Sequence, residues 1–135
     1  MKILVVDDDL GIRTALSTLI SRCQHQVVTA VDGYDALQTI GEAKTPFDLI
    51  ITDHNMPGIS GSEFVRQLRE ISPHAKVIVF AANVSPDDER RYQELNVRRM
   101  FSKPHGFKEL IEILDGLAKL STKAQLFWLD SGTAE

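Results

Sequence analysis

The sequence predicts a single α/β domain, a doubly wound parallel sheet with helices on both faces. Five short apolar segments recur along the 135 residues, and segments with helical spacing separate them. Three of the five, ILVV, LII and VIVF, are apolar at every position, which is typical of strands covered on both faces. Strands and helices that alternate in this way are joined by right-handed crossovers, so the strands are expected to be parallel.

We expect strands at residues 3–6, 26–30, 47–52, 76–81 and 97–102. The expected helices carry apolar residues every three or four positions, which gives each helix one apolar stripe. These residues are Ile12, Leu16, Leu19 and Cys23; Ala36, Leu37 and Ile40; Phe64, Leu68 and Ile71; and Phe107, Leu110 or Ile111, Leu114 and Leu117.

Local chemistry marks three helix starts. Ser60 with Glu63 has the spacing of a capping box. The segment SPDD at 85–88 combines a capping hydroxyl, a proline for the first helical position and acids for the first turn. The DG pair at 32–33 predicts a turn into a helix.

Composition excludes several classes of protein. The chain is 43% hydrophobic and 25% charged with a net charge of −4, which suits one core without disulfides and gives no general affinity for nucleic-acid phosphates. Its N-terminus reaches carboxylates too early for a signal peptide, and no apolar run approaches the roughly 18 residues of a membrane span. We therefore expect a cytoplasmic location, with neither membrane insertion nor direct nucleic-acid binding.

The periodic pattern stops after Leu120, so we expect a domain over 1–120 and a tail over 121–135 that forms no separate domain. The tail segment LFWL at 126–129 holds the only tryptophan. It either folds back over apolar surface or serves as a docking peptide, and folding back is the commoner fate of a terminal apolar cluster.

Charged residues follow three of the expected strands. Asp7, Asp8 and Asp9 follow the first, Asp53 follows the third and Lys103 follows the fifth. Because the carboxyl ends of parallel strands gather at one edge of a sheet, we expect these side chains to share one site.

Converging carboxylates need a cation, because at about 4 Å each pair repels by roughly 1 kcal/mol in water and about 4 at an effective dielectric of 20. The candidate ligands are hard oxygens, without a cysteine or a His-x-x-x-His pair, so Mg²⁺ is favoured over zinc. A carboxylate, a divalent ion and the Lys103 ammonium together suit phosphoryl transfer onto the carboxylate.

These residues make the chain resemble the receiver domain of two-component response regulators over roughly residues 1–120. The resemblance is carried by ILVVDDD at 3–9, DG at 32–33, DLIITDHNMPGISG at 48–61 and SKP at 102–104. It implies a flavodoxin-like three-layer sandwich with strand order 2-1-3-4-5, as in single-domain chemotaxis regulators.

The resemblance also implies roles for individual residues. Asp53 would be the phosphoacceptor, and Lys103 would contact the phosphoryl group. Asp8 would bind Mg²⁺ directly together with Asp53 and the backbone carbonyl of Asn55, while Asp7 would act through water or hydrogen bonds. The donor would be a phosphohistidine of a histidine kinase or histidine phosphotransfer protein. The chain would signal through protein contacts and would be no enzyme beyond its own phosphorylation and dephosphorylation.

Two positions depart from the family pattern. Ala81 stands where receivers usually have Thr or Ser, and Met100 stands where they usually have an aromatic residue. These departures motivate an alternative, an interaction module of receiver fold whose phosphorylation switch is lost or altered. Retention of the acids and of Lys103 favours the phosphorylatable receiver. A phosphatase would need a carboxylate at the position of Asn55 and ranks last.

Several other residues have structural interpretations. Since side chains alternate in direction at a strand end, His54 is expected to point away from Asp53. We expect the three remaining histidines, His25, His74 and His105, at the surface and Cys23 in the core. Four arginines on the two sides of the loop before the fifth strand either form a basic patch or are scattered and solvated: Arg90, Arg91, Arg98 and Arg99.

Overall fold

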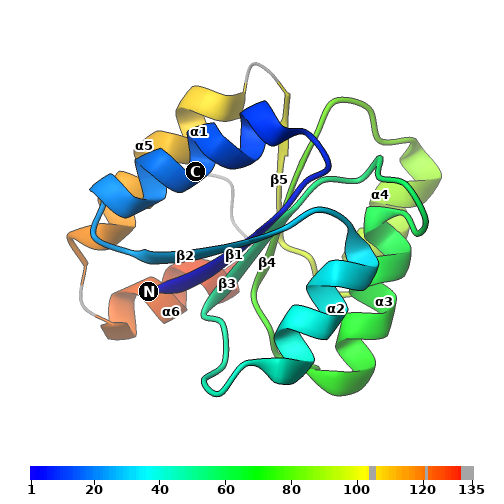
Figure 1. Cartoon of the computed structure of the whole chain (residues 1–135), viewed down its shortest axis with the longest axis horizontal. Coiled ribbons are helices and arrows are strands. Elements are labelled where there is room, and N and C mark those ends of the chain that lie inside the picture. The colour runs from blue at the N-terminus through cyan, green and yellow to red at the C-terminus, as the bar shows by residue number, and fades with distance from the viewer. Residues whose placement is uncertain (104–105, 121, 132–135) are drawn as a thin grey trace.

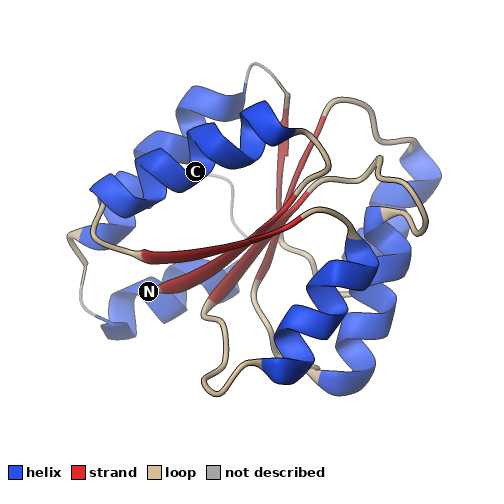
Figure 2. Ribbon diagram, in the orientation of Figure 1, coloured by secondary structure: helices blue, strands red, loops and turns tan. Residues whose placement is uncertain are grey.

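Strands and helices alternate through the computed structural model, which describes residues 1–103, 106–120 and 122–131 (Figures 1 and 2). Pro104 of the SKP motif, His105, which was expected at the surface, Ser121 and residues 132–135 lie outside the described residues. In chain order the elements are β1 (Lys2–Val6), α1 (Leu10–Arg22), β2 (Gln26–Ala30), α2 (Gly33–Glu42), β3 (Leu49–Thr52), α3 (Gly61–Ile71), β4 (Val77–Ala81), α4 (Pro86–Glu94), β5 (Arg99–Ser102), α5 (Gly106–Ala118) and α6 (Thr122–Ser131).

The five strands form one parallel sheet in the order β2-β1-β3-β4-β5, which confirms the predicted fold class and strand order. Three strands begin later than their apolar segments do. Residues 97–98, for example, precede β5, because the backbone N–H of Val97 donates to the Tyr92 carbonyl (2.9 Å) in the turn that ends α4. Asn96 adopts a positive φ of 61° in that turn. Val97 is therefore buried without belonging to the sheet.

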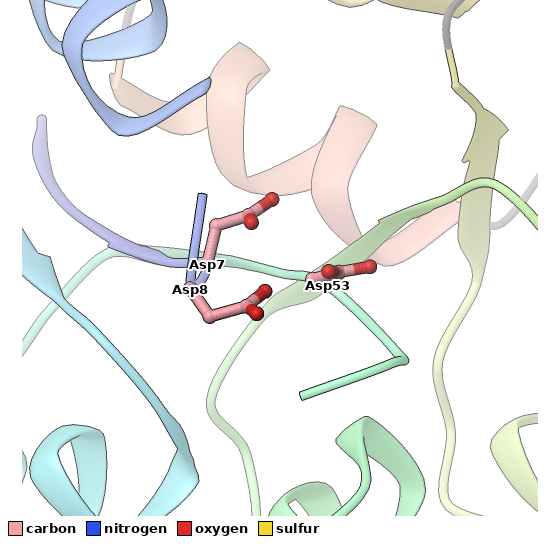
Figure 3. A group of neighbouring side chains, drawn as sticks. All are labelled: Asp7, Asp8 and Asp53. Atoms are coloured by element: carbon pink, nitrogen blue, oxygen red, sulfur yellow. The ribbon is translucent and has the colours of Figure 1, made fainter. Parts of the chain in front are cut away.

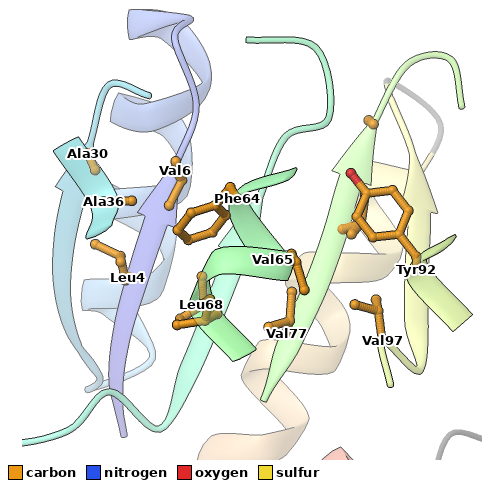
Figure 4. Packing of buried hydrophobic residues seen from close by; sticks show 13 residues of the cluster. Leu4, Val6, Ala30, Ala36, Phe64, Val65, Leu68, Val77, Tyr92 and Val97 are labelled. Atoms are coloured by element: carbon orange, nitrogen blue, oxygen red, sulfur yellow. The ribbon is translucent and has the colours of Figure 1, made fainter. Parts of the chain in front are cut away.

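The core has two halves, one on each face of the sheet. Leu4 and Val6 of β1 face the half that α2, α3 and α4 cover, where Phe64 packs near Val6 and Tyr92 lies at the other side of the cluster, near Val97 (Figure 4). The alternate residues of β1 face the half that α1, α5 and α6 cover. The alternation that a strand imposes on its side chains thus explains why the middle strands are apolar at every position.

The helix starts follow the sequence signals with one exception. Ser60, Ser85 and Asp32 cap α3, α4 and α2, each accepting a hydrogen bond from the backbone N–H three residues later. The reciprocal half of the predicted capping box is absent among the hydrogen bonds of the described residues. The Glu63 carboxylate instead binds Arg66 and Gln67 on the outer face of α3.

The tail forms α6, a helix that the apolar spacing does not predict. Leu129 is buried in the core half beneath α1 and α5. The Arg99 guanidinium lies 3.4 Å from the ring centroid of Trp128 and donates to the Trp128 carbonyl (3.1 Å). Because Arg99 begins β5, the helix contacts the sheet at the end opposite the strands' carboxyl edge. At Trp128 and Leu129 the tail folds back, as favoured for LFWL, whereas Phe127 of the same segment is exposed.

Two expectations about single residues are wrong. His25 is buried rather than at the surface, because Gln24, with a positive φ of 65°, turns the chain under α1 and into β2. Its Nδ1 lies 2.9 Å from the Met1 amine. Cys23 is only half-buried at the end of α1, with its Sγ 3.8 Å from an oxygen of Asp115, rather than in the core. His74 is exposed, as expected.

The burial of His25 predicts a pH dependence of stability. Burial lowers the pKa of His25, and the nearby amino-terminal charge lowers it further. The unfolded chain then binds more protons than the folded chain below about pH 6.5, so this contribution is present above that pH and is lost as the pH falls. We expect His25→Gln to flatten the decline in the free energy of unfolding on acidification, measured by urea denaturation. His74→Gln is the matched control, and an identical flattening in it would contradict this assignment.

No helix among the described residues is both long and apolar enough to cross a lipid bilayer.

Candidate functional site: an acidic cluster and a lysine

Three carboxylates meet at the carboxyl edge of the sheet (Figure 3). Asp7 and Asp8 follow β1, and Asp53 follows the neighbouring strand β3. One oxygen from each lies within 4.8 Å of the others. The structure therefore brings these three sequence-predicted residues together, as the ends of adjacent parallel strands require.

The members of this cluster differ in exposure. Asp7 and Asp53 are buried, whereas Asp8 is exposed. Asp7 is also fixed in place, because its Oδ1 accepts the backbone N–H of Asp9 (2.9 Å) and its carbonyl accepts the Arg13 guanidinium (2.7 Å). Asp9 itself caps α1, accepting the N–H of Ile12. Asp8 is thus the carboxylate that a solvent ion reaches most directly.

Lys103 joins the cluster from the end of β5. Its backbone N–H donates to the Ala81 carbonyl (3.0 Å), which directs the side chain toward the acids. The ammonium lies 2.6 Å from Asp7 Oδ2 and 3.3 Å from Asp53 Oδ2. Burial opposes the charge of this ammonium, but the hydrogen bond and the charge of Asp7, with those of Asp53, outweigh burial and raise the pKa of Lys103. The group therefore carries its positive charge at neutral pH.

Opposing effects act on the pKa of the buried Asp7 carboxyl. Burial raises the pKa of Asp7, and the charge of Asp53 adds to this rise, while the hydrogen bonds from Lys103 and Asp9 oppose it. One ammonium faces two buried carboxylates, with the exposed Asp8 beside them. A further positive charge at this point would relieve the remaining repulsion.

The two oxygens of Asp53 have different neighbours. Oδ1 accepts the backbone N–H of His54 (2.7 Å), and Oδ2 faces Lys103. The backbone of Asp53 is held as well, since its N–H donates to the Val6 carbonyl and its carbonyl accepts the Thr52 hydroxyl. Asp53 therefore presents a fixed carboxylate, as a nucleophile held in position requires.

The donor set fits Mg²⁺. The carboxylate oxygens of Asp7, Asp8 and Asp53 are hard ligands, and the cluster includes neither a cysteine nor a histidine among the described residues. Asn55 is exposed in the loop after β3, and its side chain donates to the Asn83 carbonyl (3.3 Å) in the loop after β4. That contact uses only Nδ2 of the amide, so both Oδ1 and the backbone carbonyl of Asn55 remain able to act as ligands.

The two departures from the family pattern lie next to each other. Ala81 is buried at the end of β4, and Met100 lies in the neighbouring strand β5. Both line a hollow of about 390 Å³ beside the loop after β4, together with Ala82, Asn83 and Val84. A threonine and an aromatic ring would occupy more of this space and would add a hydroxyl that Ala81 lacks.

The side chain of His54 contacts α4 rather than the cluster, which agrees with the prediction that it points away from Asp53. Its Nδ1 lies 2.6 Å from the Tyr92 hydroxyl, and its Nε2 lies 3.1 Å from Asp88 Oδ2. The sequence pattern indicated Asp88 only as an acid of the first helical turn and did not indicate Tyr92. The only signal was their spacing of four residues, which places both on one face of α4.

Gly61, at the start of α3, makes room for these contacts. A Cβ there would lie 2.5 Å from the Tyr92 hydroxyl and 2.8 Å from His54 Cα, and would also meet the Asp53 carbonyl. We expect Gly61→Ala to lower the free energy of unfolding by about 1–3 kcal/mol, because this backbone cannot move aside cheaply. Gly41→Ala is the control, since open space surrounds Gly41 and alanine favours a helix by up to about 1 kcal/mol. Equal stability of the two variants in urea denaturation would contradict the close approach.

The four arginines do not form one basic patch. Arg99 is buried against Trp128, and in α4 Arg90 and Arg91 pair with Asp87 and Asp88. Arg98 is exposed. Because Arg99 is buried, the alternative of four scattered and solvated arginines does not hold either.

A sheet of this strand order, with acids and a lysine at its carboxyl edge, defines a receiver-type signalling domain. The model of the response regulator receiver domain family matches residues 3–115, and the chain belongs to this family.

Similar proteins include one that this chain covers over most of its length and one that is much longer. Sporulation initiation phosphotransferase F of Bacillus subtilis (strain 168) is 30% identical over 109 residues, which cover 81% of this chain and 86% of that protein. The DNA-binding transcriptional regulator NtrC of Azospirillum brasilense is 29% identical over 133 residues, which cover 98% of this chain. The chain spans only 27% of the length of that relative.

A solved structure of the Vibrio cholerae chemotaxis protein CheY4 superimposes with a TM-score of 0.75. It is 31% identical, and the superposition covers 85% of this chain and 96% of that one. The similarity thus extends over nearly the whole receiver fold.

Proposed function

We propose that this receiver accepts a phosphoryl group on Asp53 from a phosphohistidine of a histidine kinase or phosphotransfer protein, in a reaction that depends on Mg²⁺. One observation carries the proposal: the buried Asp53 carboxylate lies beside the Lys103 ammonium and the acid pair at the sheet edge. The B. subtilis relative is named a phosphotransferase, which supports transfer from another phosphoprotein.

The chain's own residues would carry the reaction as follows. Asp53 Oδ2 attacks phosphorus, so a new O–P bond forms while the P–N bond to the donor imidazole breaks and that imidazole takes up a proton. Oδ1 keeps the His54 N–H and becomes the carbonyl oxygen of the acyl phosphate. Lys103, near both Asp7 and Asp53, supplies positive charge to the transferred phosphoryl oxygens.

Magnesium would be held by Asp8, Asp53 and the backbone carbonyl of Asn55, with Asp7 acting through water or hydrogen bonds. The exposure of Asp8 and the engagement of Asp7 by Lys103 support this division of roles. When bound, the ion supplies charge neutralisation for the phosphoryl oxygens. The receiver domain would comprise 1–120, and 121–135 would be a tail without a domain of its own.

The proposal is tested by incubating the chain with acetyl phosphate and Mg²⁺ and measuring its intact mass. We expect one added phosphoryl group, which is lost on mild alkaline treatment and does not form when EDTA replaces Mg²⁺. Formation of the same adduct in EDTA would overturn the dependence on Mg²⁺.

An interaction module of receiver fold is the second candidate, favoured by Ala81, whose buried methyl replaces the usual hydroxyl. No added mass with a small donor or with a phosphorylated histidine phosphotransfer protein would support this candidate over the first.

A further inference from the structure

On the basis of the proposed phosphorylation of Asp53, we propose that His54 and Tyr92 connect the phosphoacceptor to α4. They would do so in place of the hydroxyl and the aromatic ring that are missing at Ala81 and Met100. His54 is a positioning residue in this proposal, because it acts through its neighbours and not on the phosphoryl group.

Hydrogen bonds run continuously from Asp53 to α4. The backbone N–H of His54 donates to Asp53 Oδ1 (2.7 Å). A carboxylate can only accept, so the contact of His54 Nε2 with Asp88 places the imidazole proton on Nε2. Nδ1 shares a hydrogen bond with the Tyr92 hydroxyl (2.6 Å). Each ring nitrogen of His54 therefore has one partner, and both partners lie in α4.

The middle of this chain of contacts is buried and tightly packed. Tyr92 is completely buried, and only 6% of His54 is exposed. Their rings meet edge to face, with centroids 5.5 Å apart and an interplanar angle of 72°. The tight fit of Gly61 against both residues fixes their distance from the Asp53 backbone. A shift of the His54 backbone consequently cannot be absorbed by empty space around its ring.

Burial, with the charges of Asp88 and Asp53, raises the pKa of Tyr92, so its hydroxyl keeps its proton at neutral pH. The protonated hydroxyl can therefore donate to His54 Nδ1.

Phosphorylation would change the first bond of the chain. In the free protein Asp53 Oδ1 belongs to a carboxylate, and hydrogen bonds to ionised groups are stronger than those between neutral groups. In the acyl phosphate this oxygen is a carbonyl without that charge, so the His54 N–H is held less firmly. The two states of Asp53 therefore differ in how strongly they hold His54, which is the difference that any population shift requires.

The far end of the chain lies at the beginning of α4. Asp88 Oδ2 accepts both His54 Nε2 and the hydroxyl of Ser85, the residue that caps the helix. Asp88 Oδ1 also pairs with Arg91 (3.3 Å). A weaker hold on His54 would consequently loosen the first turn of α4, where the capping contacts lie.

This route does not pass through the two altered positions. Ala81 has no hydroxyl, and both it and Met100 border the hollow after β4 instead of contributing to these hydrogen bonds. The hydrogen bonds of His54 connect Asp53 to α4, and the side chains of Ala81 and Met100 provide no such polar connection.

The test is amide hydrogen exchange of residues 86–94, with and without beryllium fluoride and Mg²⁺ as a phosphoryl mimic. In the native chain we expect exchange in this segment to change by about five-fold, the difference between a charged and a neutral hydrogen bond. Tyr92→Phe keeps the ring and removes the hydroxyl, and we expect it to lose most of this change. Tyr34→Phe, which removes an exposed hydroxyl on α2, is the matched control and should retain the change.

A second variant distinguishes the loss of the hydrogen-bonded connection from a loss of packing around Tyr92. Asp88→Asn keeps the shape of the side chain but changes the group that accepts from His54, and we expect it to reduce the response as well. Thermal melting of each variant verifies folding, and intact mass after acetyl phosphate verifies that Asp53 still reacts.

The outcomes separate the two proposals. A native chain that takes no phosphoryl group overturns the proposed function and the connection with it. A native chain that is phosphorylated but shows no change in 86–94, or a Tyr92→Phe variant with the full native response, overturns the connection alone.

Discussion

Replacing Asp53 by Asn is expected to abolish phosphoryl uptake while leaving the protein folded. The amide has nearly the shape of the carboxylate and can still accept the His54 N–H, but it lacks the nucleophilic oxygen anion. We therefore expect the mass increment formed with acetyl phosphate and Mg²⁺ to fall to background. Intact mass spectrometry of the native chain and the variant, treated side by side, measures this.

Asp9→Asn is the matched control for that experiment. Asp9 belongs to the same acidic triplet, but its side chain caps α1, and asparagine caps a helix equally well. This variant should take up the phosphoryl group as the native chain does. Equal uptake by Asp53→Asn would show that another residue is the acceptor.

Removal of Asp8 is expected to eliminate most of the stabilisation by Mg²⁺. The ion relieves repulsion among carboxylates that converge only in the folded state, so it binds the folded chain preferentially. Linkage gives about 2.7 kcal/mol at an ion concentration 100 times its Kd. Asp8→Ala loses the most exposed carboxylate of the cluster, and its melting temperature should barely respond to Mg²⁺. Thermal denaturation across a magnesium titration measures the effect.

The same Asp9→Asn variant controls for the loss of one acid from the triplet, and its response to Mg²⁺ should equal that of the native chain. A full response to Mg²⁺ in Asp8→Ala would count against Asp8 as a direct ligand. Calcium in place of Mg²⁺ tests whether the site accepts a larger ion of the same charge.

The sequence was most informative where a strand is buried on both faces. The continuous apolar segments of β1, β3 and β4 identified the middle of the sheet, and alternating helices implied its parallel connections. By contrast, α6 has only a short apolar contact through Leu129 and Trp128, which local spacing does not distinguish from an exposed segment. The burial of His25 depended on the turn at Gln24 and on the distant N-terminus, so composition alone could not predict it.

The cluster itself could be predicted because strand ends in a parallel sheet share an edge. Asp7, Asp8, Asp53 and Lys103 come together for that reason. The sequence did not indicate that Lys103 lies closer to Asp7 than to Asp53, since that choice depends on side-chain geometry.

The His54–Tyr92 contact joins residues 38 positions apart, one in the loop after β3 and the other in α4. Such contacts depend on how the helices pack against the sheet. The spacing within α4 could suggest that Asp88 and Tyr92 share a face, but not that His54 would lie between them.

Formation of an acyl phosphate on Asp53 can be tested by reducing the phosphorylated chain with borohydride and mapping its peptides. Borohydride converts an acyl phosphate on aspartate to homoserine, so the position of homoserine identifies the acceptor. We expect homoserine at position 53, formed only after treatment with a phosphodonor and Mg²⁺. Homoserine at Asp7 or Asp8, or phosphorylation without any homoserine, would contradict it.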